Sequence, residues 1–349
     1  MYKRILSLLL ALLLCLSAVS PALAAGTGYS DVPESHWAAG SIRRAGELGL
    51  FQGVGGGLFG RGQPITRSAF VTALVRLFGW EAVTPDTPSY TDVTADQWYY
   101  SAVETARANG AFVTSGKTFR PRENITREEM AVMLVRSLGY ASLAGTVSSQ
   151  PSPFSDVVTN RGFITLAYDM GIVSGMGGGR FAPRSTATRE QAAAVMVRVY
   201  DKLYAQSTLL ESAEGYALLS IPTPQPAEGQ ELPTTPLEPM AELYTALQAL
   251  KQAGTDMKTV ALSLCGGGVR TVVSSGRVLE TRTISAQEVA QALEQSNVRL
   301  YYSDRYESAY CIYPHAGYQT VTLWYQSEVS LAAKLKLARL FGVEQYVLY

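Results

Sequence analysis

Residues 125–140, ITREEMAVMLVRSLGY, predict a helix with an unfavourable first turn. Thr126 is a good N-cap, and Glu129 three residues later completes a capping box, so the helix should begin here. Arg127 then lies in the first turn, where unpaired N–H groups and the positive end of the helix dipole disfavour a cation. We therefore ask what favours an arginine at this position.

The same arrangement occurs three times, with a period of about sixty residues. Each unit predicts a helix ended by a glycine, a Gly-rich loop with a recurring phenylalanine that should be buried, and a second helix capped by threonine. A helix–loop–helix of this kind cannot bury its apolar face alone, so we expect three units packed into one helical body. The residues that recur in register are Asp31, Asp92 and Asp156; Gly49, Gly110 and Gly171; Phe59, Phe119 and Phe181; Thr66, Thr126 and Thr188; Arg67, Arg127 and Arg189.

Two interpretations of the repeated arginine are open. A helix N-terminus attracts anions, and a guanidinium adds a planar fork that matches a carboxylate, so the arginine could belong to an anion site. Alternatively, each arginine pairs with an aspartate of a neighbouring repeat, such as Asp92, and only joins the units. Trp37 and Trp98 could stack on sugar rings near such a site, or they could fill the core.

The recurring SDV, tryptophan, glycine and ITRE elements resemble the S-layer homology domain of secreted proteins from bacteria with a thick cell wall, over residues 29 to about 203. The resemblance implies a pseudo-threefold bundle whose grooves bind a secondary cell-wall polymer carrying anionic, pyruvylated sugars. It also implies a set of polymer-binding residues, in which the arginines contact the acidic ketal: Arg67, Arg127, Arg189, Asp31, Asp92, Asp156, Trp37 and Trp98.

The three repeats do not match this pattern equally. The first has ITRSAF and lacks the capping box, whereas the third is about three residues shorter, has Thr159 near the tryptophan position and has ATRE in place of ITRE. The second repeat matches best, and Arg127 is therefore the first arginine to test.

Composition and the N-terminus indicate a secreted protein. The 29 basic and 29 acidic residues balance, which argues against nucleic-acid binding. Residues 1–25 combine Lys3 and Arg4, an apolar run and the small-residue stretch ALAA, so they predict a cleaved signal peptide. The remaining sequence has no apolar run long enough to span a membrane. Cys265 and Cys311 allow one disulfide but do not require it.

The predicted domain order places three repeats before a smaller α/β domain. The repeats are expected at 29–80, 90–140 and 154–203. Six prolines within 204–240 favour an extended linker, or else a long loop of the next domain. Residues 241–349 alternate helical and strand patterns and predict α/β structure.

Residues 321–349, VTLWYQSEVSLAAKLKLARLFGVEQYVLY, are similar to the last strand–helix–strand of glycoside hydrolase family eighteen barrels. This resemblance implies a partial or degenerate TIM-barrel-like domain, with the family's small insertion at 284–318. The family's catalysis rests on a run of aspartates ending in a glutamate, and this chain has no such run. We therefore expect no catalytic residue, and the chain's two histidines give no support for a metal site or cofactor.

The sequence thus predicts a protein located at the cell wall or S-layer, anchored noncovalently by its repeats to a secondary polysaccharide linked to peptidoglycan, and displaying a non-catalytic α/β domain. One alternative is a cell-wall or chitin-like glycan hydrolase of the family-eighteen type. The other is a lattice-forming S-layer protein that self-associates.

Overall fold

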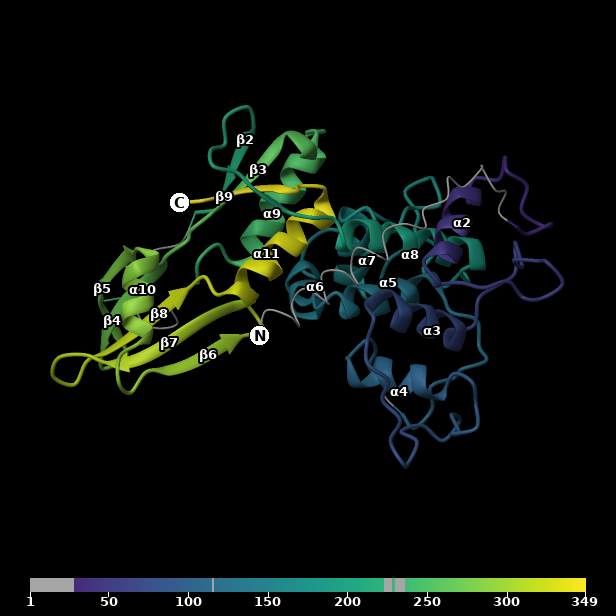
Figure 1. Cartoon of the computed structure of the whole chain (residues 1–349), viewed down its shortest axis with the longest axis horizontal. Helices are drawn as coiled ribbons and strands as arrows, with labels where there is room; N and C mark the ends of the chain where they lie inside the picture. Colours follow the sequence, from purple (N-terminus) through teal and green to yellow (C-terminus); the bar gives the residue numbers. More distant parts are fainter. Residues whose placement is uncertain (1–27, 115, 223–227, 230–235) are drawn as a thin grey trace, which may run out of the picture.

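The computed structural model describes residues 28–114, 116–222, 228–229 and 236–349 of the 349-residue chain. A helical body made by the three repeats lies at one end and an antiparallel sheet at the other, with two helices and a parallel sheet between them (Figure 1). Within the described residues, no helix is both long and apolar enough to cross a membrane. The predicted signal peptide, residues 1–25, lies outside the described part of the chain.

Each repeat folds into the two helices that its sequence predicts. The threonine before each second helix accepts a hydrogen bond from the backbone N–H three residues later, and only the first repeat lacks the full capping box, since it has Ala69 at that position. The glycine after each first helix has a φ of +68° or +69°, as expected for a left-handed C-terminal turn. The helices are α2 (Ala39–Glu47), α3 (Arg67–Phe78), α4 (Tyr100–Ala108), α5 (Arg127–Ser137), α7 (Arg161–Asp169) and α8 (Arg189–Leu203).

A further short helix, α6 (Ala141–Val147), follows the second repeat and was not expected from the sequence. It packs against α7. The contact requires Gly162, because a Cβ atom there would lie 1.8 Å from the carbonyl oxygen of Ala144. Only glycine allows two backbones to approach this closely.

The three recurring aspartates each hold the loop of their own repeat. Their carboxylates accept hydrogen bonds of 2.7 to 2.9 Å from successive backbone N–H groups that begin at the loop phenylalanine. Burial raises the pKa of Asp31, but the three N–H donors outweigh it and leave that pKa below its ordinary value. The N–H of Phe181 lowers the pKa of Asp156 in the same way. The aspartates therefore fix the loops that bury Phe59, Phe119 and Phe181.

The C-terminal part contains a parallel sheet with strand order β1-β9-β3-β2. Helices α9 and α11 pack against each other beside it (Figure 1). These elements are β1 (Thr208–Leu209), β2 (Ala217–Ser220), α9 (Met240–Gln252), a 3-10 turn η1 (Met257–Thr259), β3 (Val260–Leu264), α11 (Glu328–Phe341) and β9 (Gln345–Leu348).

The structure corrects the linker expected at 204–240. Strands β1 and β2 fall inside that range and pair with β9 and β3. The physical reason is that all six prolines lie between 222 and 239, so residues 204–221 keep every backbone N–H and include the apolar run YALLSI at 216–221. The α/β part therefore begins near residue 208 and not at 241.

A five-stranded antiparallel sheet, ordered β5-β4-β8-β7-β6, is inserted between β3 and β9. It spans residues 268–325, more than the 284–318 insertion that the sequence suggested, and it includes the strand expected to precede the last helix of a barrel. Cys265 and Cys311 are buried and unbridged. The elements are β4 (Gly268–Ser274), β5 (Arg277–Ile284), α10 (Ala286–Leu293), β6 (Arg299–Ser303), β7 (Ser308–Pro314) and β8 (Thr320–Tyr325).

The helical body and the parallel sheet region share one continuous apolar core. Three lysines reinforce this junction, each donating to a carbonyl at or next to the C-terminal end of a helix in the other part. Unpaired carbonyls and the negative end of the dipole favour a cation at such a position. The bonds are Lys202 Nζ to Leu340 O (2.8 Å), Lys336 Nζ to Leu138 O (2.8 Å) and Lys251 Nζ to Asp169 O.

A buried ion pair fixes the segment before α9. Lys334 and Glu238 are both fully buried and lie 2.9 Å apart, measured from Nζ to Oε2. Lys334 also donates to Leu237 O and Gln326 Oε1, and Glu238 accepts from the N–H of Cys265. Burial lowers the pKa of Lys334, partly opposed by Glu238. Both charges are therefore satisfied only when all these groups are in place.

We predict that Lys334→Met destabilises the protein by about 3–5 kcal/mol, because Glu238 would remain as an unpaired buried charge. Urea unfolding of the mature chain measures this. The double variant Lys334→Met, Glu238→Gln should recover much of the loss, since the glutamine keeps an acceptor for Cys265 N–H. Lys258→Met, at an exposed lysine, is the control. A Lys334 variant as stable as this control would contradict the prediction.

We predict a pH-dependent effect of Asp31→Asn. The pKa of Asp31 in the folded protein lies below the ordinary value of 3.8, so its stabilising contribution is present above that value and is lost as the pH falls through the folded-state pKa. The variant should therefore melt below wild type at about pH 7, and the difference should shrink at about pH 3. Thermal unfolding followed by circular dichroism tests this; a difference that does not change with pH would refute it.

Candidate functional site

The three arginines join the repeats in a closed cycle. Each donates its Nε hydrogen to the carbonyl of the loop phenylalanine in the following repeat, and its guanidinium lies over that phenyl ring. The third repeat returns to the first. The bonds are Arg67 to Phe119 O (2.9 Å), Arg127 to Phe181 O (2.8 Å) and Arg189 to Phe59 O (2.9 Å).

Arg127 lies in a hollow of about 240 Å³, here called the Arg127 groove, to which all three repeats contribute. Trp37 comes from the first repeat, Arg127 from the second, and Gln191 and Arg198 from the third. Arg127 is 6% exposed, and within the described part of the chain its guanidinium donates to the carbonyls of Phe181 and Ser174. None of the described residues that line this groove is acidic. It therefore combines two guanidinium groups without an internal counterion.

Burial lowers the pKa of Arg127, and the more distant Asp156 partly opposes this effect. An arginine nevertheless stays charged at neutral pH, because its ordinary pKa is above 12. A charge with this little solvent interacts more strongly with an anion than an exposed one does. The groove is thus chemically suited to a carboxylate.

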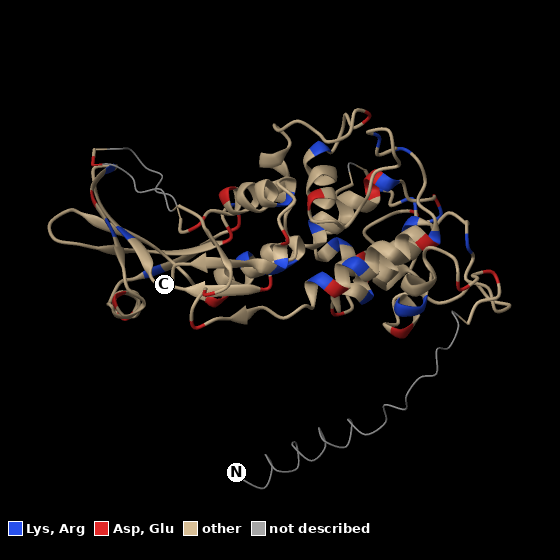
Figure 2. Cartoon of the chain, turned by 90° about the horizontal axis from the view of Figure 1, so that it is seen from above, with Lys and Arg blue, Asp and Glu red and all other residues tan. Residues whose placement is uncertain are grey.

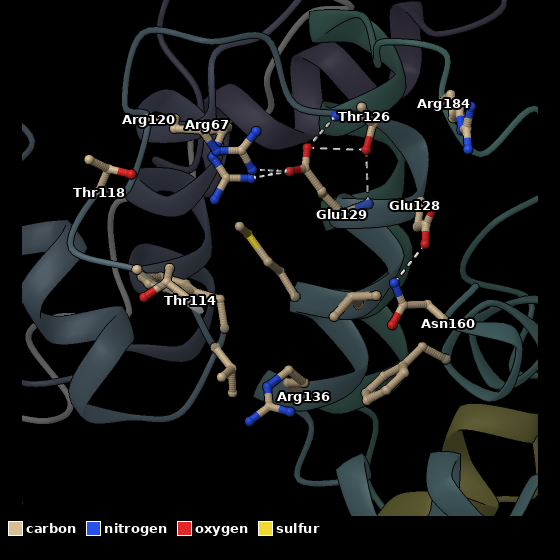
Figure 3. Close-up of a pocket in the computed structure, with 16 residues that line it drawn as sticks. Arg67, Thr114, Thr118, Arg120, Thr126, Glu128, Glu129, Arg136, Asn160 and Arg184 are labelled. Atoms are coloured by element: carbon tan, nitrogen blue, oxygen red, sulfur yellow. Dashed lines mark hydrogen bonds and ion pairs between the residues drawn. The ribbon is translucent and has the colours of Figure 1, made fainter. Parts of the chain in front are cut away.

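The corresponding hollow around Arg67, here called the Arg67 groove, differs in charge. Arg67 Nη1 lies 2.5 Å from Glu129 Oε1, and the two side chains point toward each other (Figure 3). The same oxygen pairs with Arg120 at 2.9 Å. The other carboxylate oxygen of Glu129 accepts from the N–H of Thr126 in the capping box. Arg67 therefore already has an internal counterion.

None of the described residues that line the Arg67 groove is a tryptophan. Asn160 and Phe163 of the third repeat line it where Trp37 lines the Arg127 groove. The hydroxyl of Thr159 and the amide of Asn160 both donate to Glu128 Oε1 at 2.6 Å (Figure 3 shows the Asn160 bond). These polar groups satisfy one another, and the aromatic residue at this position is the half-buried Phe163 and not an exposed tryptophan.

Arg189 faces the loop of the first repeat. Its Nη2 donates to Gln52 O at 2.8 Å, and burial lowers its pKa. The first repeat has Ala69 at the position that Glu129 occupies in the second, so no capping-box carboxylate is available there. In having no capping-box carboxylate beside its guanidinium, Arg189 thus resembles Arg127 and differs from Arg67.

The two tryptophans expected to bind sugar lie on the surface. Trp37 is 61% exposed and Trp98 is 68% exposed, which excludes the core-filling interpretation for both. Trp37 lines the Arg127 groove, whereas Trp98 lies edge-on against Tyr99 at 5.2 Å between ring centroids. An exposed indole next to buried cations is an arrangement that can hold a sugar ring beside its acidic group.

The structure revises how the arginines join the repeats. The carboxylate paired with Arg67 is Glu129 and not Asp92, which instead holds its own loop. Each aspartate therefore binds the N–H of the same phenylalanine whose carbonyl accepts from an arginine of the preceding repeat. Sequence reasoning missed the position that decides whether an arginine has a counterion. This is the third position of each second helix, which faces the arginine of the preceding repeat and is Ala69, Glu129 or Gln191.

Figure 2 shows basic and acidic positions interspersed over the helical body. The whole chain has no formal net charge. Any preference for an anion must therefore come from local groups such as those of the Arg127 groove, and not from a long-range field.

Comparison with known proteins identifies the repeats. The family model of the S-layer homology domain matches residues 28–71, 89–131 and 153–193, which are the three helical units. They confirm the three tandem S-layer homology domains expected from the sequence.

Two relatives are similar to part of the chain. An endoglucanase from Bacillus sp. (strain KSM-635) is 30% identical over 237 residues, covering 62% of this chain and 25% of the relative. The S-layer protein sap from Bacillus anthracis is 27% identical over 214 residues, covering 61% of this chain and 26% of the relative. The chain thus spans about a quarter of the length of these relatives.

Among solved structures, a chitinase from Chromobacterium violaceum is similar at 16% identity, with a TM-score of 0.32 over 39% of this chain and 40% of that one. A score this low supports no conclusion about activity. The matched domains and the S-layer relative indicate a cell-surface or S-layer location. The helical body of this protein consists of three S-layer homology domains.

Proposed function

We propose that the helical body holds this protein noncovalently on the bacterial cell wall by binding a secondary wall polymer that carries pyruvylated, anionic sugars. The observation that carries the proposal is the Arg127 groove. It has two guanidinium groups, no acidic residue among its described lining and an exposed tryptophan. A carboxylate ketal would supply the missing counterion, while the sugar ring would lie against Trp37.

We further propose that the three repeats form a pseudo-threefold bundle. The cyclic hydrogen bonds from each arginine to the next repeat support this, as do three isolated β-bridges between successive repeats. Such symmetry would give three related grooves. Their different counterions imply that they do not bind equally.

The α/β part is proposed to be non-catalytic, as a degenerate or partial barrel. Glu238 is the fully buried acid of this part, and Lys334 neutralises it. Glu307 is bound by the hydroxyl of Tyr302. Both carboxylates are thus engaged in other interactions, whereas a glycosidase needs a separated pair of carboxylates that can act on the substrate. Release of reducing ends from peptidoglycan or chitin oligomers, lost in an acidic-to-amide variant, would instead establish the hydrolase alternative.

A lattice-forming role is the second candidate, favoured by the likeness to an S-layer protein. It predicts ordered self-assembly of the mature chain. Light scattering and electron microscopy test it directly, and a monodisperse monomer at high concentration would count against it.

We predict that Arg127→Ala weakens binding to purified sacculi more than Arg67→Ala does. Both variants lose an equivalent bond to a phenylalanine carbonyl; Arg67→Ala also loses the ion pair with Glu129, and Arg127→Ala loses the bond to Ser174 O. Of these two arginines, Arg127 is the one without a carboxylate within ion-pair distance in the described structure, and an added anion should therefore interact mainly with it. Co-sedimentation with sacculi measures the difference, expected to be about tenfold in affinity.

Sacculi stripped of acid-labile polymer are the control, and they should retain neither wild type nor variant. Thermal unfolding of both variants ensures that lost binding does not reflect lost folding. Equal binding by wild type and Arg127→Ala would mean that the arginines serve only as joints between repeats.

We predict that Glu129→Gln increases polymer binding. The substitution removes the counterion of Arg67, leaves Arg120 paired with Glu123, and keeps an oxygen for the N–H of Thr126. The third repeat provides the precedent, since Gln191 Oε1 accepts from Thr188 N–H in the same capping box. Titration with isolated polymer should show higher affinity or a larger number of sites. Unchanged binding would show that the Arg67 groove is excluded for another reason, such as its missing tryptophan.

A further inference from the structure

We propose that polymer binding extends from the Arg127 groove into a second cavity, between the third repeat and α9, which takes an uncharged, hydroxyl-rich sugar unit. This inference rests on the proposed function. It assigns the α/β part a role in recognition, because one wall of this second site belongs to it.

The cavity, here called the interdomain cavity, has a volume of about 550 Å³, within the range of small-molecule sites. Tyr168 and Asp169, at the end of α7, form one wall. Gln248, Lys251 and Gln252, on α9, form the opposite wall. Neither part of the chain could build this site alone.

The two hollows adjoin. Val173 and Ser174 line both the Arg127 groove and the interdomain cavity. The carbonyl of Ser174 accepts from Arg127 Nη2 at 2.6 Å, so the residue that separates the hollows also holds the arginine in place. A chain of linked sugars that places its acidic unit at Arg127 therefore has an adjacent site for its next unit.

The polar groups of the interdomain cavity suit sugar hydroxyls. Asp169 is 7% exposed, and its carboxylate accepts from Tyr244 Oη (2.5 Å) and Gln248 Nε2 (2.8 Å). Thr165 also lines the cavity, although its hydroxyl oxygen is itself buried within the protein. The side-chain amides of Gln248 and Gln252, two further lining residues, can donate to and accept from sugar hydroxyls.

An aromatic surface completes the site. Tyr168 is 40% exposed and is held edge-on against Phe154, with 4.9 Å between ring centroids. A ring that is fixed but accessible can pack against the apolar face of a sugar at little entropic cost.

The charge of the interdomain cavity distinguishes it from the Arg127 groove. The Asp169 carboxylate would repel a second acidic ketal, while the nearby Lys251 already donates to the carbonyl of the same residue. The first hollow thus favours an anion and the second an uncharged unit. Together they select a polymer in which a pyruvylated sugar is followed by a neutral one.

The test compares two probes on the full mature chain. The short probe is a monosaccharide carrying a pyruvate ketal, and the long probe is the isolated wall polymer. Tyr168→Leu and Gln252→Ala should weaken binding of the polymer by about fivefold to tenfold and leave binding of the monosaccharide unchanged. Tyr318→Leu, at a fully exposed tyrosine outside both hollows, is the matched control.

The outcomes separate this inference from the proposed function. If Arg127→Ala abolishes binding of both probes while Tyr168→Leu and Gln252→Ala bind the polymer like wild type, the interdomain site is refuted and the anchoring function stands. If the Tyr168 and Gln252 variants lose polymer binding while Arg127→Ala does not, the interdomain site is supported and the Arg127 groove is refuted. Equal weakening of both probes by Tyr168→Leu would indicate a general structural effect and overturn the inference.

Discussion

The helical body depends on one repeated interaction, the hydrogen bond from an arginine Nε to the phenylalanine carbonyl of the next repeat. The carbonyl is in position because an aspartate of its own repeat holds the adjacent N–H groups. The arginine in turn must lie in the first turn of its helix to reach across the boundary, although the dipole disfavours it there. An arginine that destabilises the isolated helix is therefore required for the packing of the three repeats against one another.

The Nε atom makes the same bond in all three repeats, but the partners of the two Nη atoms differ from repeat to repeat. Glu129 neutralises Arg67 and caps α5 at the same time, so a residue that stabilises its own helix also removes a binding charge from the preceding repeat. Gln191 caps α8 equally well but brings no charge to Arg127. One capping position thus decides both a local helix start and the electrostatics of a groove. Variation there changes which groove can bind an anion without changing the fold.

Much of the helical body could be predicted from the sequence, because its signals are local. Cap threonines, C-terminal glycines and apolar spacing each report on a few consecutive residues. The partner of Arg67 could not be predicted, since Glu129 meets it only through the cyclic packing of repeats. Strands β1 and β2 were missed because the average composition of 204–240 concealed a proline-free segment at its start. Helix α6 and the extent of the antiparallel sheet likewise depend on contacts distant in sequence.

The junction between the helical body and the α/β part determines how the C-terminal part would be oriented on an anchored protein. A flexible tether would let the C-terminal part rotate freely, whereas the shared core and the three lysine-to-carbonyl bonds hold it in one orientation. The antiparallel sheet then stays at the end of the molecule opposite the repeats (Figure 1). Its edge strand β6 exposes Leu300, Tyr301 and Tyr302 there. A protein anchored through the grooves of its repeats would therefore present the sheet in a defined direction, set in part by Lys251, which also lines the interdomain cavity.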